Sequence, residues 1–241
     1  MEPKVKWGIA GFVLGLVLVS VVYYVFFAIE PYPLPADMRI LEPASLDPGT
    51  PSETPRYSLQ EAVSQNLVDY KITGTGSSSG GSLIVALQNK AGFPIDVYIL
   101  PGTILAPTGG EVQRMMAWRA LAVVTEDNNQ PVNVTSFYLP DAGVRFGMVE
   151  AYCLDFELPN PQVTSNFAVA AEVDMVTASV VYAAKQENMS VAATQVAVWK
   201  NRDDHITQQE ISGKFEASKE DFDKAFELVR RVRKARGSQG A

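Results

Sequence analysis

The chain has 241 residues, of which 47% are hydrophobic, and its formal net charge at pH 7 is −7. This length suits one domain with an appendage, and the hydrophobic fraction suffices for a core. The negative charge argues against nucleic acid as a partner, because an acidic surface repels a phosphate backbone. The single cysteine excludes an intramolecular disulfide.

Residues 7–29 are predicted to form a transmembrane helix. The stretch carries no charge over its whole length, and about 20 apolar residues span a bilayer as a helix. Lys4 and Lys6 precede it and Glu30 follows it. Because positive flanks stay inside, we expect a single-pass protein of the cell membrane with a cytoplasmic amino terminus and an extracytoplasmic remainder. The aromatic end of the stretch and the missing small-x-small site favour an uncleaved signal anchor over a cleaved signal peptide.

Residues 30–57 are predicted to form a stalk. Proline at high density disfavours helices and sheets and favours extended chain. The prolines of this segment are Pro31, Pro33, Pro35, Pro43, Pro48, Pro51 and Pro55. The stalk would separate the membrane from a domain that spans residues 58–241. Ser58 and Glu61 have capping-box spacing ahead of apolar residues at helical intervals, which predicts a short helix at the start of this domain.

The first part of the domain is predicted to be a β-sandwich-like body. Several short apolar runs are separated by Gly, Pro and Asn/Asp clusters, which is typical of a sandwich or barrel. The candidate strands cover residues 82–88, 93–100, 121–125, 132–138 and 144–149. The glycine-rich segment 74–81 lacks the Gly-Lys-Ser/Thr of a phosphate loop and is interpreted as a turn. Residues 128–131 are interpreted as a hairpin turn.

The pattern becomes helical after Cys153. Helices are predicted over residues 168–185 and 190–200, and a third begins at a cap formed by Ser218 and Asp221. The third helix ends in a basic cluster, which suits a helix carboxyl end. The predicted fold class is therefore α+β, with a transmembrane helix, a proline-rich stalk and a sandwich-like body under a C-terminal helical cap.

Catalytic and cofactor motifs are absent from the sequence. No dinucleotide fingerprint, nucleophile elbow or zinc-protease motif occurs. The one histidine, His205, follows Asp203 and Asp204, and such oxygen ligands could serve calcium. Adjacent carboxylates after a helix more often form a solvated loop, so we expect neither a metal nor a cofactor. We also expect no enzymatic turnover.

One cysteine and one glutamine are the candidate site residues. Cys153 ends an apolar run in the sequence Tyr-Cys-Leu-Asp, and Gln195 interrupts an apolar helical stretch in Thr-Gln-Val-Ala-Val-Trp. A glutamine in such a helix needs a partner, because burying an unpaired amide costs a few kcal/mol. The chain crosses over through Pro159 and Pro161, so a returning helix can bring Gln195 against Cys153. A lone cysteine is most often an inert, buried apolar side chain, and this alternative stays open for Cys153.

The segments 152–155 and 194–199 resemble the signature of thioester-domain surface proteins of the TQXA type. In that family a cysteine on a strand condenses with a glutamine carboxamide on a helix, which releases ammonia and leaves an internal thioester. The resemblance implies that Cys153 is the nucleophile and Gln195 the acyl donor. Tyr152, Asp155 and Trp199 would then position or shield the bond.

Three functions are compatible with these features. The first is a membrane-anchored, non-enzymatic interaction domain of thioester-domain type, for adhesion or assembly. The second is a covalent adhesin, in which a Cys153–Gln195 thioester captures an amine of a partner. The third is an accessory single-span subunit of a membrane complex, with Gly11 and Gly15 facing another helix. The expected partners are the lipid bilayer, through residues 7–29, and a protein at the cell surface or in a membrane complex.

Overall fold

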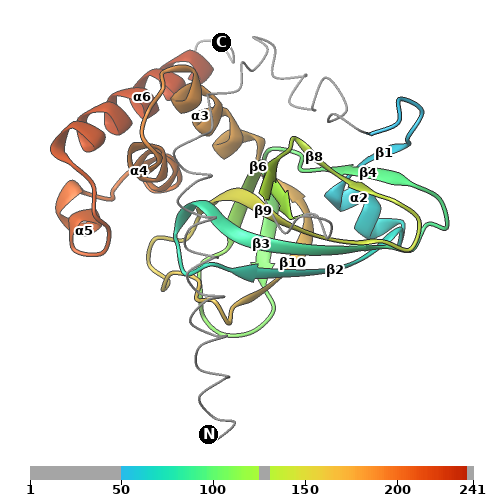
Figure 1. Ribbon diagram of the computed structural model, residues 1–241. Coiled ribbons are helices and arrows are strands. Elements are labelled where there is room, and N and C mark those ends of the chain that lie inside the picture. Colours follow the sequence, from blue (N-terminus) through green and yellow to red (C-terminus); the bar gives the residue numbers. More distant parts are fainter. Residues whose placement is uncertain (1–49, 125–130, 238–241) are drawn as a thin grey trace, which may run out of the picture.

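The structure, a computed structural model, describes residues 50–124 and 131–237 (Figure 1). The predicted anchor at 7–29 and the stalk up to residue 49 lie outside the described residues. So do residues 128–130 of the predicted turn at 128–131, whose last residue, Pro131, begins a strand. Within the described ranges, no helix combines the length and the apolar character needed to cross a membrane. The transmembrane element of the predicted fold class therefore has no counterpart in this part of the chain.

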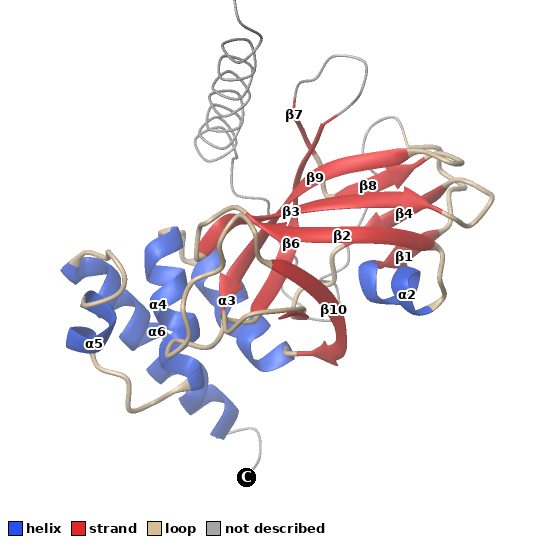
Figure 2. Cartoon of the chain, turned by 90° about the horizontal axis from the view of Figure 1, so that it is seen from below, coloured by secondary structure: helices blue, strands red, loops and turns tan. Residues whose placement is uncertain are grey.

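The body of the domain is a closed barrel of six antiparallel strands (Figures 1 and 2). Their hydrogen-bonded order is β5-β10-β2-β3-β9-β6, and β6 pairs back onto β5. A seventh strand, β7 (Pro131–Asn133), pairs with β6 outside this ring. The barrel strands are β2 Val68–Gly74, β3 Ser79–Asn89, β5 Thr103–Pro107, β6 Met115–Val124, β9 Val144–Cys153 and β10 Asn166–Val173.

The barrel shows that the predicted β-sandwich is wrong. The deciding element is β10, whose residues 168–173 were predicted as the first third of a helix over residues 168–185. Alanine and valine in this segment are compatible with a helix, but tertiary pairing makes it a strand: β10 pairs with β2 on one side and β5 on the other. This strand joins two edges that a sandwich would leave open, and its pairing satisfies the backbone groups of both.

A smaller sheet packs against the barrel. It has the order β1-β4-β8, with β1 (Arg56–Ser58) parallel to β4 (Ile95–Tyr98) and β8 (Ser136–Leu139) antiparallel to β4. Gly147 of β9 permits the close contact, because a Cβ there would lie 2.3 Å from Cε1 of Phe137 in β8. Since β1 belongs to this sheet, the folded domain includes the end of the segment that was predicted as a stalk.

The predicted helix at the start of the domain is confirmed. It is α2 (Leu59–Ser64), and it begins at a capping box in which Ser58 Oγ accepts from the Glu61 N–H and the Glu61 carboxylate accepts from the Ser58 N–H at 2.7 Å. The box satisfies backbone donors that have no partner inside the helix. Leu59 and Ala62 are buried, so α2 contributes to the main core.

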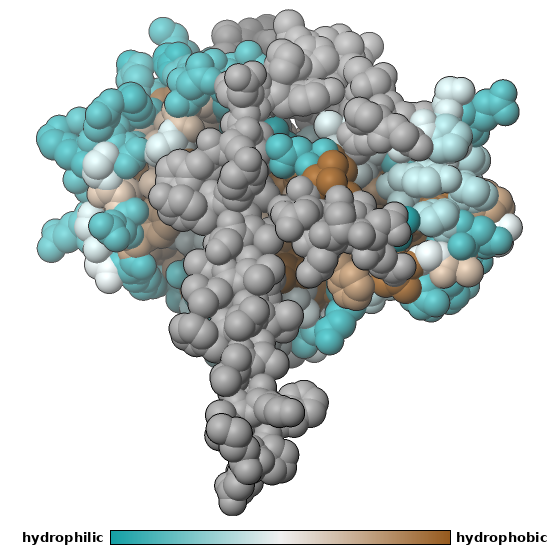
Figure 3. Space-filling view, in the orientation of Figure 1, coloured by the Kyte–Doolittle hydropathy of each residue, from teal (hydrophilic) through white to brown (hydrophobic). Residues whose placement is uncertain are grey.

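Four further helices gather beside one end of the barrel (Figures 1 and 2). They are α3 (Met175–Gln186), α4 (Val191–Arg202), α5 (Gln208–Ser212) and α6 (Lys219–Gly237). The cap predicted for the last helix is confirmed, since the Asp221 N–H donates to Ser218 Oγ at 3.1 Å. Helix α4 is the central one, with every residue of 193–199 buried. The outer surface over α5 and α6 is mainly hydrophilic (Figure 3), so this layer buries its apolar residues inward.

Candidate functional site: the junction of β9 and α4

Cys153 and Gln195 lie in direct contact where the barrel meets the helices. Both residues are 0% exposed. The Cys153 N–H donates to Gln195 Oε1 at 3.0 Å, and Gln195 Nε2 donates to the Cys153 carbonyl at 2.8 Å. The carboxamide thus bonds to the end of β9 as a neighbouring peptide group would. Both of its polar atoms are satisfied, which is the condition for burying an amide without a large cost.

The elements that carry the two residues are positioned by local bonds. Cys153 ends β9, where it is paired with Met115 of β6, and its N–H also donates to the Ser78 carbonyl at 3.0 Å. Helix α4 is capped by Ser190, whose Oγ accepts from the Ala193 N–H. A capped helix and a paired strand end are both rigid supports, so the contact between them is well defined.

The Cys153 thiol faces an apolar interior. Its Sγ lies 3.3 Å from Sδ of Met115. Burial raises the pKa of the Cys153 thiol well above its ordinary value, and the negative charge of Asp155 raises it further. The thiol is therefore neutral at pH 7, which makes it a weak nucleophile in this state.

Three residues of α4 face the barrel end in a row at spacings of four and three: Gln195, Trp199 and Arg202. The Trp199 indole N–H donates to Gln113 Oε1 at 3.2 Å, and its ring meets Phe156 and Phe215 edge-on at centroid distances of 5.3 and 5.2 Å. Trp199 thus covers the junction with aromatic surface beside Gln195. The role proposed for Trp199, to position or shield a thioester, stays a prediction.

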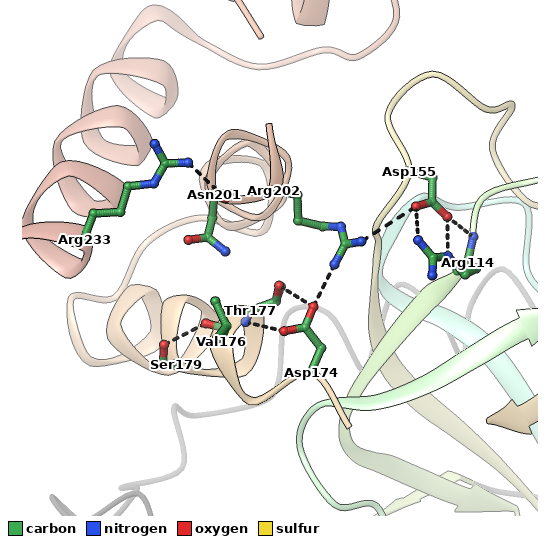
Figure 4. Close-up of polar contacts among 9 residues, drawn as sticks. All are labelled: Arg114, Asp155, Asp174, Val176, Thr177, Ser179, Asn201, Arg202 and Arg233. Carbon is green, nitrogen blue, oxygen red and sulfur yellow. Dashed lines mark hydrogen bonds and ion pairs between the residues drawn. The ribbon is translucent and has the colours of Figure 1, made fainter. Parts of the chain in front are cut away.

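Asp155 belongs to a chain of ion pairs at the rim of the junction (Figure 4). Arg114 binds it with two guanidinium nitrogens, at 2.8 and 2.6 Å, and with its backbone N–H at 3.1 Å. Arg202 lies 4.0 Å from Asp155 and 2.7 Å from Asp174. Burial alone would raise the pKa of Asp155, but the bonds and charge of Arg114, aided by Arg202, lower it below the usual range. Asp155 is therefore a charged anchor rather than a base.

Tyr152 lies on the other side of β9, because successive strand residues point to opposite faces. It packs in a different apolar cluster from Cys153, and its hydroxyl donates to Glu150 Oε1 at 2.5 Å. Glu150 also binds Lys185 at 2.5 Å and Arg119 at 2.8 Å. Burial by itself would raise the pKa of Glu150, but the charges of Lys185 and Arg119 outweigh it and lower that pKa to about 2. Tyr152 thus positions Glu150 and does not line the thiol.

The candidate calcium ligands do not converge. Asp203 accepts from the His205 N–H at 2.8 Å, whereas Asp204 pairs with Arg233 and Lys200. All three candidate residues are exposed. Across the described ranges, no group of three or more His, Cys, Asp or Glu side chains could hold a metal ion.

Sequence reasoning missed four polar residues of the junction and its surroundings: Gln113, Arg114, Glu150 and Arg202. Gln113 and Arg114 directly precede an apolar strand, and Arg202 follows Gln195 by seven residues, two turns along the same helical face. The helical spacing of Arg202 was a usable signal. The burial of Glu150 had no such signal, because one acid in an apolar run can face either water or a partner.

Comparisons of the chain with protein-family models, curated proteins and solved structures found no match. The resemblance to thioester-domain proteins therefore gains no independent support from known proteins.

Proposed function

We propose that this protein is a non-enzymatic binding domain in which Cys153 and Gln195 close into an internal thioester that captures an amine of a partner. The observation that carries the proposal is the reciprocal contact between Gln195 and the backbone of Cys153. The single cysteine of the sequence, Cys153 on β9, and the carboxamide of Gln195 on α4 are in contact and fully buried. This is the reactant pair that the resemblance requires.

The chemistry balances without a co-reactant. The Cys153 sulfur adds to Cδ of Gln195, the C–N bond of the carboxamide breaks, and ammonia leaves with the thiol proton. A partner amine later attacks the same carbon, the S–C bond breaks, and an amide forms while Cys153 regains its thiol proton. Each chain reacts once, so the domain binds its partner covalently without turnover.

The environment suits the storage of such a bond. Complete burial excludes the water that would hydrolyse a thioester. The Cys153 N–H donates to Gln195 Oε1 and so favours negative charge on that oxygen during addition. The raised pKa of the thiol makes closure slow, which a reaction that occurs once per chain tolerates.

A non-covalent interaction domain is the second candidate. It is favoured by one observation: both polar atoms of the Gln195 carboxamide already have partners, so the pair is satisfied without any bond. In this case the pair is a structural link between barrel and helices. The partner would then bind elsewhere on the surface.

Intact mass of the purified full chain under denaturing conditions separates the two candidates. A thioester makes the wild-type chain lighter than its calculated mass by one ammonia, whereas Cys153→Ala and Gln195→Ala have their full calculated masses. Methylamine added to folded wild type should raise the mass by one methylamine and release a titratable thiol. A wild type of full calculated mass with a titratable thiol would end the covalent proposal and leave the non-covalent domain.

The location of the domain stays a proposal from the sequence, because residues 1–49 lie outside the described part. We propose that the domain faces the cell exterior, where a protein partner would present lysine amines. Protease added to intact cells should then digest or release the domain. Protection of the domain until the cells are lysed would contradict this location.

A further inference from the structure

We infer that Arg202 is a positioning residue for the Cys153–Gln195 pair: by bridging Asp155 and Asp174 it holds α4 against the end of β9 and limits access to the pair. A role of Arg202 in thioester chemistry rests on the proposed function. Its role in limiting access to Cys153 and Gln195 rests only on the contacts of Arg202.

The bridge joins the two chain segments that carry the pair. Arg202 follows Gln195 by two helical turns, or about 10 Å along α4, and Asp155 follows Cys153 by two residues. The Trp199–Gln113 bond lies between these two contacts along the helix. The face of α4 that carries Gln195 is therefore held at several points, and Arg202 is the charged contact at its C-terminal end.

Both carboxylates that Arg202 contacts are also held by other residues. Asp174 is the N-cap of α3, where it accepts from the Thr177 N–H at 2.9 Å and the Thr177 hydroxyl at 2.7 Å. Asp155 accepts hydrogen bonds from two guanidinium nitrogens of Arg114. Figure 4 shows the Arg202 guanidinium between the two acids. Bonds to two carboxylates that have other partners restrain the helix that carries the arginine, because movement of α4 away from the barrel would break them.

Access to the pair requires movement. Cys153 and Gln195 are fully buried, so an amine or a thiol reagent reaches them only when the junction opens locally. The side chains of the bridge are partly exposed, at 29% for Arg202 and 19% for each acid. Salt therefore weakens the bridge but leaves the apolar contacts of α4 intact. The rate of opening should depend on Arg202 and on ionic strength together.

The test measures the rate at which a neutral thiol reagent labels Cys153 in the folded full chain that carries Gln195→Ala, so that no thioester can form. In this background Arg202→Ala should label roughly five- to tenfold faster, the size expected for loss of a partly buried charge-assisted bond. Arg202→Lys should lie between the two. Arg231→Ala is the matched control, because Arg231 on α6 forms an exposed pair with Glu187 at 2.7 Å, and it should not change the rate.

Salt provides a second readout that general destabilisation would not reproduce. Raising the sodium chloride concentration should accelerate labelling when Arg202 is present and have little effect in the Arg202→Ala chain. Urea unfolding of each variant separates local opening from global unfolding. If Arg202→Ala fails to fold, Arg202→Lys and the salt series carry the test.

Equal labelling rates with and without Arg202, or equal salt dependence, would overturn the inference. The mass of the wild-type chain reports on the proposed function separately. A thioester in the wild type together with unchanged labelling in Arg202→Ala defeats the positioning role alone. A wild type without a thioester together with faster labelling in Arg202→Ala defeats the covalent function and leaves Arg202 in control of access to Cys153.

Discussion

Strand β9 joins the barrel to the helices in two different ways. At the end of the strand, the backbone of Cys153 meets Gln195 of α4 through two neutral hydrogen bonds, and both residues are fully buried. On the strand face opposite the Cys153 side chain, Glu150 meets Lys185 of α3 through an ion pair, with Arg119 and Tyr152 as further partners. One strand thus carries a neutral link and a charged link a few residues apart.

The difference shows what each kind of polar group needs in order to be buried. The Gln195 amide has one acceptor and one donor group directed at a single residue, so the backbone of Cys153 satisfies it. The Glu150 carboxylate needs three donors, and its two cations remain partly exposed, at 28% for Arg119 and 23% for Lys185. A buried charge becomes strongly destabilising when one of its partners is removed, because its lost hydration is then no longer offset. We therefore expect substitutions in the charged link to lower the free energy of unfolding more than substitutions in the neutral link.

Removing the charge of Glu150 should have the largest effect. Glu150→Gln leaves Arg119 and Lys185 without a carboxylate, and loss of one member of a buried ion pair costs about 3–5 kcal/mol. Urea unfolding followed by circular dichroism measures the change. Glu187→Gln, which removes an exposed pair with Arg231, is the control and should cost less than about 1 kcal/mol. Equal losses in the two variants would contradict the comparison.

Acid should weaken the charged link and spare the neutral one. The pKa of Glu150 is lowered from 4.5 to about 2, which corresponds to roughly 3 kcal/mol of stability. Because the folded state has the lower pKa, this stability is complete above the unfolded value near 4.5 and is lost as the pH falls toward 2.

The measurement is the difference in unfolding free energy between wild type and Glu150→Gln at several pH values. That difference should be constant above about pH 5 and should shrink as the pH approaches 2. A difference that does not change with pH would show that the ionised carboxylate is not the source of the stability.

Removing the neutral link should have a smaller effect. In Gln195→Ala the Cys153 N–H keeps the Ser78 carbonyl as an acceptor, but the Cys153 carbonyl loses Gln195 Nε2 as a donor and a cavity forms. Together these changes should cost about 2–3 kcal/mol in urea unfolding, with little change between pH 5 and 3. Gln186→Ala, at an exposed position of α3, should stay within about 0.5 kcal/mol of wild type. A loss for Gln195→Ala as small as that of the control would show that the two hydrogen bonds contribute little.

The sequence by itself determined the features that depend on residues close together in the chain. The capping boxes of α2 and α6 were read from Ser58 with Glu61 and from Ser218 with Asp221, because a cap involves one helical turn. Polarity within an apolar helix also predicted that Gln195 needs a buried partner. Cys153 was the proposed partner, and the two residues do lie in contact.

Only the tertiary structure decided how the sheet closes and which charges meet. Residues 168–173 favour a helix by composition and were predicted as one, but the pairing of β10 with β2 and β5 makes them a strand. The partners of Glu150 come from β6, β9 and α3, and those of Arg202 follow β9 and begin α3. These contacts join residues far apart in the chain, whose meeting depends on barrel closure. Local spacing shows which groups need a partner, whereas the fold determines which partner each one finds.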